Sequence, residues 1–505
     1  MRSPGESLRI PITDTRDNPG ASRRAREGET MMNLGNHGGT PSGRRHRPLV
    51  RAAAMAVVLA AVAAPLFSQA APEPTRKELL ERDGIIWGTK AAWITPFEEN
   101  IREDLKIAGL ARFWMEAKMN FPRFSKVPDL DWDKTFIDYL PRVRATATTH
   151  AYYKVLQEVA ALLQDAHTEV FLPAELKERM EVEPPIRLDL IEGRVFVAAV
   201  DPSLVKDGLL PGLEILKVDG VPVRDYADRF RRPYVGSNTA AHRELTIFCH
   251  GLLAGPKDTP VALELRDGSG RISTRTVPRG HAGMPKPAPF ERRSLPGNIA
   301  YLALNTFDDE IVIKQFEEAL PELRGSDGIV LDVRENEGGS GEIAFNVIGD
   351  LSDKDFDTPA WRSREYIATL RAWGTAGGWY EPKPRKWSAR KGAAAAVPVV
   401  LLTGPRSLSA TDVFAEVFRK IGRGRIVGEP TGGGTGDPLS FAIPGGGAGR
   451  VSTSGDGPGG IVGVGVVPDV LVKRTAADYL ARRDAALEAG IAELRRMIRK
   501  RHGGT

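Results

Sequence analysis

The sequence predicts an α/β protein built from a helical N-terminal domain, a small β-rich domain and a larger α/β domain. Three observations indicate this. Residues 72–178 carry apolar side chains at helical spacing, and residues 179–282 carry short β-rich runs bounded by turn signals. Residues 283–475 alternate continuous apolar strands with amphipathic helices, which is typical of a sheet covered by helices.

Composition limits the classes of function. The chain has 505 residues, of which 41% are hydrophobic and 27% charged, so it can bury a substantial core. Residues 1–71 hold ten Arg and five acids, and the remainder holds 60 basic and 60 acidic side chains. A neutral body offers no electrostatic footprint for nucleic acid, so we expect no nucleic-acid partner. Cys249 is the only cysteine, which excludes an intrachain disulfide, and no clustered Cys/His pattern occurs, so we expect no metal and no cofactor.

The N-terminal segment has the pattern of an export signal. Residues 1–43 are rich in Gly, Ser, Arg and Pro and are expected to be a disordered extension. Residues 44–71 run from basic through apolar to small side chains, as a signal peptide does, with cleavage near Ala70 or Ala71. The apolar run 52–67 is shorter than the roughly 20 residues of a membrane span. We therefore expect an exported protein, periplasmic or extracellular in a bacterium, with an uncleaved anchor as the alternative and as the one expected membrane contact.

The first two domains have distinct periodicities. Helices are expected around 105–115 and over His150–Leu163, separated by a Pro/Asp-rich loop. The β-rich domain is expected to contain strands at Arg194–Val200, Leu213–Val218 and Val261–Arg266. A Pro-rich linker near 283–292 separates this domain from the next.

The α/β domain alternates its elements regularly. The expected strands are Ile299–Leu304, Gly328–Val333, Val397–Leu402 and Ile426–Val427. The expected helices are Ile311–Leu323, Glu342–Leu351 and Ala410–Ile421. Residues 476–505 are expected to form a charged C-terminal helix, Ala476–Lys500, and a short tail.

Ser409 lies where an apolar strand has ended, a short Gly/Pro loop follows and a helix begins. As an N-cap, its hydroxyl accepts a backbone N–H, and Asp412 at the third position completes a capping pattern. As a nucleophile, its developing oxyanion meets exposed N–H groups at the positive end of the helix. Local sequence alone favours the cap, because caps are common.

A glycine pair, Gly338-Gly339, follows another apolar strand. Glycines expose backbone amides with no side chain in the way, which suits an oxyanion hole or a close backbone approach. A phosphate loop is the alternative, but the stretch lacks the spacing and the lysine of that motif. We expect the nearby Asp332 and Arg334 to form a structural ion pair.

His167 follows the second predicted helix and is flanked by Asp165, Thr168 and Glu169, which can orient or charge its ring. Histidine is the usual general base for a serine nucleophile, because its pKa lies near neutrality. The alternative is a solvent-exposed loop histidine.

Seven segments, in order, resemble the S41-type peptidases, which include tail-specific (C-terminal processing) and tricorn-core-like members. The resemblance runs from about residue 100 to 475. The segments are 165–168, 208–223, 299–307, 332–339, 403–410, 427–433 and 463–469. Each motif is weak alone, but seven in order make a specific match.

The resemblance implies a crotonase-like α/β core at 283–475, with an inserted PDZ-like domain at 179–282 that holds an extended peptide end by strand addition. It implies peptide-bond hydrolysis of extended or unfolded polypeptides through an acyl-enzyme on Ser409. The matching general base is His167. The backbone N–H groups of Ala410 and of Gly338 or Gly339 are the implied oxyanion donors. The oligomeric state is left open.

The sequence departs from the family pattern at three positions. Gly434 stands where tail-specific members carry a catalytic lysine, and Val462 where tricorn-like members carry a glutamate. Ala166 stands where some members carry a serine beside the histidine. The acid that would orient His167 is therefore unassigned, and its loss can cost about 10⁴ in turnover. Three carboxylates are candidates: Asp165, Asp412 and Asp437.

Two further hypotheses follow from these departures and from the fold. In the first hypothesis, the chain is a catalytically impaired relative that acts as an envelope peptide-binding protein through residues 185–280. A more distant alternative uses the crotonase-like core for acyl-thioester chemistry, which the export signal disfavours because such cofactors are intracellular.

Overall fold

The computed structural model describes residues 91–280, 284, 287–375, 377–390, 392–457, 459–501 and 503. The predicted extension and signal peptide lie outside the described residues. The described residues all belong to one compact unit. This unit combines helices with several sheets, which confirms the α/β prediction. The crotonase-like and PDZ-like assignments stay predictions, as do the domain boundaries.

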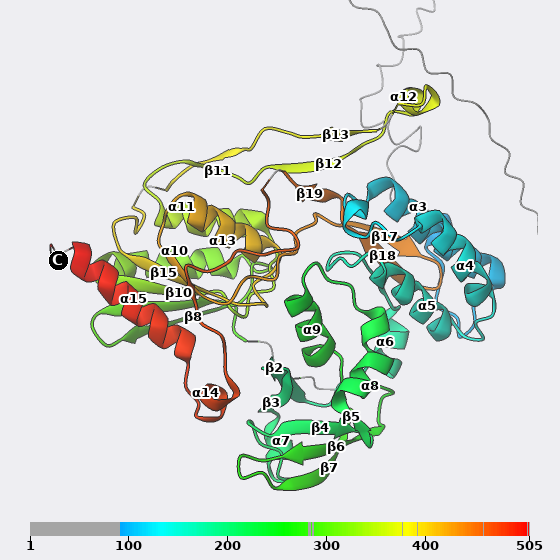
Figure 1. Ribbon diagram of the computed structural model, residues 1–505, viewed down its shortest axis with the longest axis horizontal. Coiled ribbons are helices and arrows are strands. Elements are labelled where there is room, and N and C mark those ends of the chain that lie inside the picture. Colours follow the sequence, from blue (N-terminus) through cyan, green and yellow to red (C-terminus); the bar gives the residue numbers. More distant parts are fainter. Residues whose placement is uncertain are drawn as a thin grey trace, which may run out of the picture. The chain divides into compact units, whose positions relative to one another are not determined.

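A six-stranded sheet forms the centre of the α/β part, in the order β20-β16-β15-β10-β9-β8 (Figure 1). Its neighbours are parallel, except that β8 is antiparallel to β9. The strands are β8 (Phe290–Leu295), β9 (Ile299–Leu304), β10 (Gly328–Asp332), β15 (Val399–Thr403), β16 (Arg425–Gly428) and β20 (Val470–Leu471). The four strands predicted from the apolar runs are all members of this sheet.

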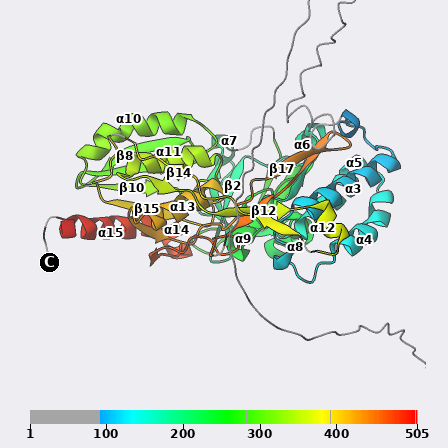
Figure 2. The same cartoon turned by 90° about the horizontal axis from the view of Figure 1, so that it is seen from above.

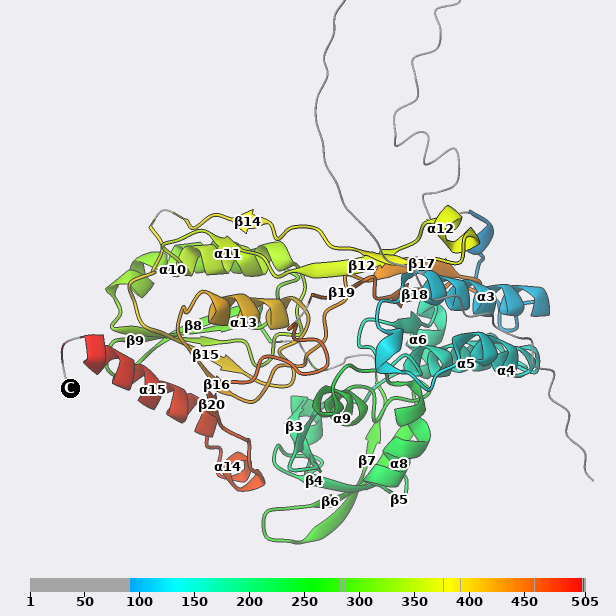
Figure 3. The same ribbon diagram turned by 45° about the horizontal axis from the view of Figure 1, so that its top comes forward.

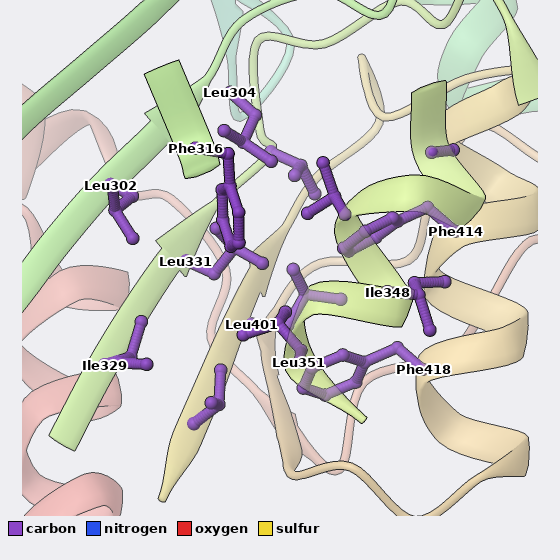
Figure 4. Packing of buried hydrophobic residues seen from close by; sticks show 14 of the residues in the cluster. Leu302, Leu304, Phe316, Ile329, Leu331, Ile348, Leu351, Leu401, Phe414 and Phe418 are labelled. Atoms are coloured by element: carbon purple, nitrogen blue, oxygen red, sulfur yellow. The ribbon is translucent and has the colours of Figure 1, made fainter. Parts of the chain in front are cut away.

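Helices cover both faces of the sheet, because successive strand side chains alternate between two cores (Figure 2). Ile329 and Leu331 face a core shared with three helices, whereas Val330 faces Leu494 on the opposite side. Figure 4 shows the first core, where Phe414 and the neighbouring helical side chains close over the sheet. The helices of that face are α10 (Ile311–Gly325), α11 (Gly341–Leu351) and α13 (Ala410–Lys420), and the opposite face carries α15 (Ala485–Arg501).

The helical part of the chain is completed by a distant hairpin. Strands β17 (Leu439–Ile443) and β18 (Gly447–Val451) pair with β1 (Glu169–Phe171) in a three-stranded sheet. Side chains of this hairpin share a core with the N-terminal helices. Those helices are α3 (Glu103–Asn120), α4 (Trp132–Arg144), α5 (Thr149–Ala161) and α6 (Ala174–Met180). The sequence predicted α3 and α5 but placed the start of α4 in a loop.

The β-rich part forms an antiparallel sheet in the order β2-β3-β4-β6-β7, with the short β5 paired to β4. Two helices, α8 (Val223–Phe230) and α9 (Ala240–Cys249), pack on it. The strands are β2 (Ile186–Ile191), β3 (Arg194–Val200), β4 (Glu214–Val218), β5 (Val221–Pro222), β6 (Pro260–Arg266) and β7 (Ile272–Pro278). Strand β2 lies at the edge of this sheet.

A long excursion between α11 and β15 was not predicted. It contains β11 (Phe356–Asp357), β12 (Trp361–Glu365), α12 (Ala368–Ala372), β13 (Gly378–Tyr380) and β14 (Lys386–Trp387). Strand β12 pairs with β13 and with β19 (Ser454–Asp456). Figure 3 shows these strands running from the central sheet towards α3, with α12 at the far end.

The C-terminal prediction needs a correction. The single helix expected over Ala476–Lys500 is two helices, α14 (Ala476–Leu480) and α15, joined by a turn in which Arg482 has a φ of 56°. A non-glycine residue in that conformation cannot continue a right-handed helix. None of the described helices is both long and apolar enough to cross a membrane.

Candidate active site

Ser409 is the N-cap residue of α13, at the carboxyl end of β15. Its backbone has a φ of 60°, a conformation that a non-glycine residue adopts at a cost of about 1–3 kcal/mol. The backbone N–H of Ser409 donates to Gly434 O (3.0 Å) and to Asp412 Oδ2 (2.9 Å). These bonds hold the strained turn.

His167 lies in the turn between α5 and β1, and its side chain meets Ser409. The distance from His167 Nε2 to Ser409 Oγ is 3.0 Å, although the two residues are 242 positions apart. Only 7% of His167 is exposed, so the alternative of a solvent-exposed loop histidine is wrong. A base at hydrogen-bond distance from a hydroxyl is the arrangement that activates a serine nucleophile.

Asp165 fixes the turn that carries His167, through five hydrogen bonds. The backbone N–H of His167 donates to its Oδ1 (3.0 Å). The other donors are Thr168 Oγ1 (2.9 Å), Ser452 Oγ (2.6 Å), Asn238 Nδ2 (2.9 Å) and the Arg123 guanidinium. Burial alone would raise the pKa of Asp165, but the charge of Arg123 and these hydrogen bonds hold that pKa below its usual range. The carboxylate is thus ionised and fully occupied.

The other ring nitrogen of His167 is not oriented by an acid. Within the described residues, its buried Nδ1 has no hydrogen-bond partner. Burial lowers the pKa of His167 to about 4, against the attraction of Asp165 and with a further lowering by Arg450. The imidazole is therefore neutral at pH 7, as a general base must be, but it is a weaker base than an ordinary histidine.

The three candidate acids have different roles in the structure. Asp165 is taken up by the turn, and Asp412 is completely buried beneath the nucleophile. Asp412 accepts the backbone N–H groups of Ser409, Gly433 (2.9 Å) and Gly434 (3.1 Å), and burial raises its pKa to about 6 despite these bonds. Asp437 is solvent-exposed, and its negative charge acts on His167.

Two backbone N–H groups near Ser409 are free to donate. Gly338 lies against the nucleophile, since a Cβ added to it would stand 2.7 Å from the Ser409 Cβ. Its own N–H donates to Asn336 Oδ1 (2.9 Å) and is therefore engaged. Within the described chain, the N–H groups of Gly339 and Ala410 make no hydrogen bond.

Gly434 and Val462, which stand where family members carry a lysine and a glutamate, are both in packed surroundings. A Cβ added to Gly434 would stand 2.8 Å from Asn238 Oδ1 and 3.0 Å from a Leu408 methyl group, so a side chain there would have to displace Asn238. Val462 is 7% exposed, and its N–H donates to the Asp456 carboxylate. Neither position holds a base or an acid.

Several positioning residues were not found from the sequence. Asn336 is fully buried and connects the glycine turn to the loop that carries Ser409. Its backbone carbonyl accepts the Leu408 N–H (3.2 Å), and its Nδ2 donates to Leu304 O (3.0 Å). Asn238, from the β-rich part, accepts the N–H of Ala166 (3.1 Å) and donates to Asp165. Local sequence gives no signal for such residues, because their partners are distant in the chain.

Other predicted features are placed as follows. Asp332 and Arg334 form the expected ion pair (2.6 Å), which extends to Asp484 (2.8 Å). Among the described residues, no group of three His, Cys, Asp or Glu side chains is arranged to hold a metal ion.

Comparison with known proteins identifies a family match in the part of the chain that carries Ser409. Residues 298–472 match the model of peptidase family S41. The structure of mature CPAF is 16% identical over 79% of this chain and 98% of its own, with a TM-score of 0.63. The photosystem II D1 C-terminal processing protease is 20% identical over 75% of this chain and 98% of its own, with a TM-score of 0.46. The likeness to CPAF supports a shared fold, at an identity too low to carry over an activity.

Proposed function

Residues 298–472 form a domain of peptidase family S41, and we propose that this chain is a serine endopeptidase with Ser409 as nucleophile and His167 as general base. The observation that carries the proposal is the 3.0 Å contact between His167 Nε2 and Ser409 Oγ. The strained conformation of Ser409, with a φ of 60°, supports it, because strain at a helix start is characteristic of exposed nucleophiles.

In the proposed acylation step, Ser409 Oγ bonds to the carbonyl carbon of the scissile peptide while its proton passes to His167 Nε2. The carbonyl π-bond breaks and its oxygen becomes an oxyanion. That oxyanion accepts the free N–H groups of Ala410 and Gly339, at the positive end of α13. The carbonyl then re-forms, the C–N bond breaks, and the proton on Nε2 goes to the leaving amine. Water repeats the sequence on the acyl-enzyme.

The base is proposed to work without a carboxylate on its Nδ1. The turn held by Asp165 fixes the ring position, so orientation comes from the backbone. The negative charges that attract His167, first Asp165 and then the solvent-exposed Asp437, are proposed to stabilise the transient imidazolium. Because burial outweighs these charges in lowering the pKa of His167, we expect modest turnover rather than a fully efficient triad.

The proposed substrate is an extended or unfolded polypeptide, and the β-rich part is proposed to be a PDZ-like module that receives it. Strand β2 lies at the edge of that sheet, beside α9, where a peptide strand can be added. We also propose that the chain is exported and that its signal peptide is cleaved near Ala70 or Ala71, on the basis of the N-terminal sequence.

The decisive test uses a fluorophosphonate probe and an unfolded protein such as reduced casein. We expect the wild type to be labelled and to cleave casein, and Ser409→Ala to do neither. Ser407→Ala is the matched control, because Ser407 is a buried neighbour whose hydroxyl donates to Val333 O (2.8 Å). A wild-type protein that is folded but neither labelled nor active contradicts the proposal.

A second function is favoured by the unpartnered Nδ1 of His167 and by the apolar Val462: an inactive relative that binds peptides in the envelope. It predicts peptide binding by residues 185–280 at micromolar affinity with no turnover. Hydrolysis that disappears in Ser409→Ala excludes it.

A further inference from the structure

The excursion between the helix α11 and the strand β15 exposes a cluster of aromatic side chains. We call residues 361–387 the aromatic arm. All five of the large Trp and Tyr side chains that are prominently exposed in the described chain lie on it, together with Ile367 (44% exposed). The five are Trp361, Tyr366, Trp373, Trp379 and Tyr380, with exposed fractions from 39% to 73%. Such a concentration marks an interaction surface.

The arm is also strongly basic. It holds six basic and two acidic side chains, whereas the chain after residue 71 is neutral as a whole. At its tip, residues 366–380 contain Arg371 and no acid. The Arg371 guanidinium lies 5.9 Å from the Tyr366 ring centre and donates to the Tyr366 hydroxyl (3.4 Å). An arm with this charge is complementary to an anionic partner.

The form of the arm decides among anionic partners. Figures 1 and 3 show α12 at the far end of two paired strands, beyond the central sheet. The described cavities of about 1050 and 460 Å³ are lined by residues outside the arm. The tip of the arm combines Trp and Tyr with Arg and has no acidic side chain, which is typical of segments that lie at the interface of a bilayer.

A second copy of the chain fits this surface less well. A two-fold dimer through the arm would place the same patch of each subunit against its equal. Two arms with the same net positive charge repel each other, and this repulsion is strongest at low ionic strength.

We propose that the tip of the aromatic arm, residues 366–375 and 377–380, inserts into the interface of a bilayer that contains anionic lipids. Trp373, which is 73% exposed, and Ile367 enter the acyl boundary, while Arg371 contacts lipid phosphate. This contact is separate from the N-terminal apolar segment and does not depend on the peptidase activity.

The test reads the arm locally in the full chain, so that attachment through the N-terminal segment does not affect it. The only cysteine is first removed by the substitution Cys249→Ser. A new cysteine is then introduced by Thr375→Cys and carries an environment-sensitive fluorophore. The matched control carries the same label at Ser269→Cys, an exposed turn of the β-rich part. Both proteins are mixed with vesicles of phosphatidylcholine alone or with added phosphatidylglycerol.

We expect the label at position 375 to brighten and shift to the blue with phosphatidylglycerol vesicles, and the label at 269 to stay unchanged. Arg371→Glu should weaken the lipid dependence about tenfold, and Trp373→Ser should suppress the shift, with melting curves equal to that of the parent. An unchanged label at 375, or equal changes at both positions, overturns the proposal. A shift that needs no lipid and grows with protein concentration shows that the arm binds a second copy instead.

Discussion

In the proposed mechanism, the acid limb of the pH–rate profile depends on one buried histidine, His167. Burial lowers the pKa of His167 from the ordinary 6.5 to about 4. Only the neutral imidazole accepts a proton, so activity is lost as the pH falls through the pKa of the free enzyme. At pH 5 a base with a pKa of about 4 is about 90% neutral, whereas an ordinary histidine is about 3% neutral. We therefore expect kcat/KM at pH 5 to stay near its neutral plateau.

The assay follows kcat/KM for a fluorogenic peptide from pH 4 to 8, with circular dichroism at each pH to verify folding. Asp412 complicates the profile, because burial raises its pKa to about 6 and it supports the backbone of Ser409. The same profile is therefore measured for Asp412→Asn. Arg450→Gln should move the His167 limb to higher pH, because the Arg450 charge lowers that pKa. A limb near pH 6.5 that persists in Asp412→Asn refutes the reasoning.

Three further predictions concern the surroundings of the site. Gly434→Lys should create no Ser–Lys dyad and should lower activity at least about tenfold, because its Cβ would stand 2.8 Å from Asn238 Oδ1; activity at or above wild type contradicts this. Asn238→Ala removes one of the hydrogen-bond donors to the Asp165 carboxylate and should lower kcat about tenfold with little change in KM. Asn120→Ala, which removes an amide that donates to Glu116 O within α3, should change neither. Burial lowers the pKa of His242 from 6.5 to about 4, so the free energy of unfolding should fall as the pH drops from 6.5 to 4. His242→Gln should reduce this change of the free energy of unfolding with pH by up to about 1.4 kcal/mol per pH unit; urea unfolding that shows the same pH dependence in the variant contradicts the prediction.

The parts of the site that sequence could predict are those written in local patterns. An apolar strand, a Gly/Pro loop and a helix start placed Ser409 at the end of β15, where the structure has it. The glycine pair at 338–339 was predicted for the same reason, although the bond from Gly338 N–H to Asn336 shows which amide is already used. Patterns of this kind are short in sequence and fix a backbone conformation directly.

The network around Asp165 could not be predicted, because its donors come from three distant regions. Arg123, Asn238 and Ser452 lie 42, 73 and 287 positions away in the chain. Each of these residue types is ordinary on a surface, and its role exists only after folding has brought the segments together. The aromatic arm was missed for a different reason: its strands are exposed and lack the apolar alternation from which a half-buried strand is recognised.

Of the three departures from the family pattern, the one at Gly434 is explained by the hydrogen bonds of its backbone. At position 434 the carbonyl accepts the N–H of Ser409 and the N–H donates to Asp412, so the glycine supports the strained nucleophile through its backbone alone. A lysine there would have to displace Asn238, which holds the turn of His167. A site that retains Asn238 and Gly434 is therefore committed to the histidine as its base. Burial keeps the pKa of that base low, and in the proposed mechanism the hydroxyl is activated by a neutral, weakly basic imidazole whose position is set by the fold.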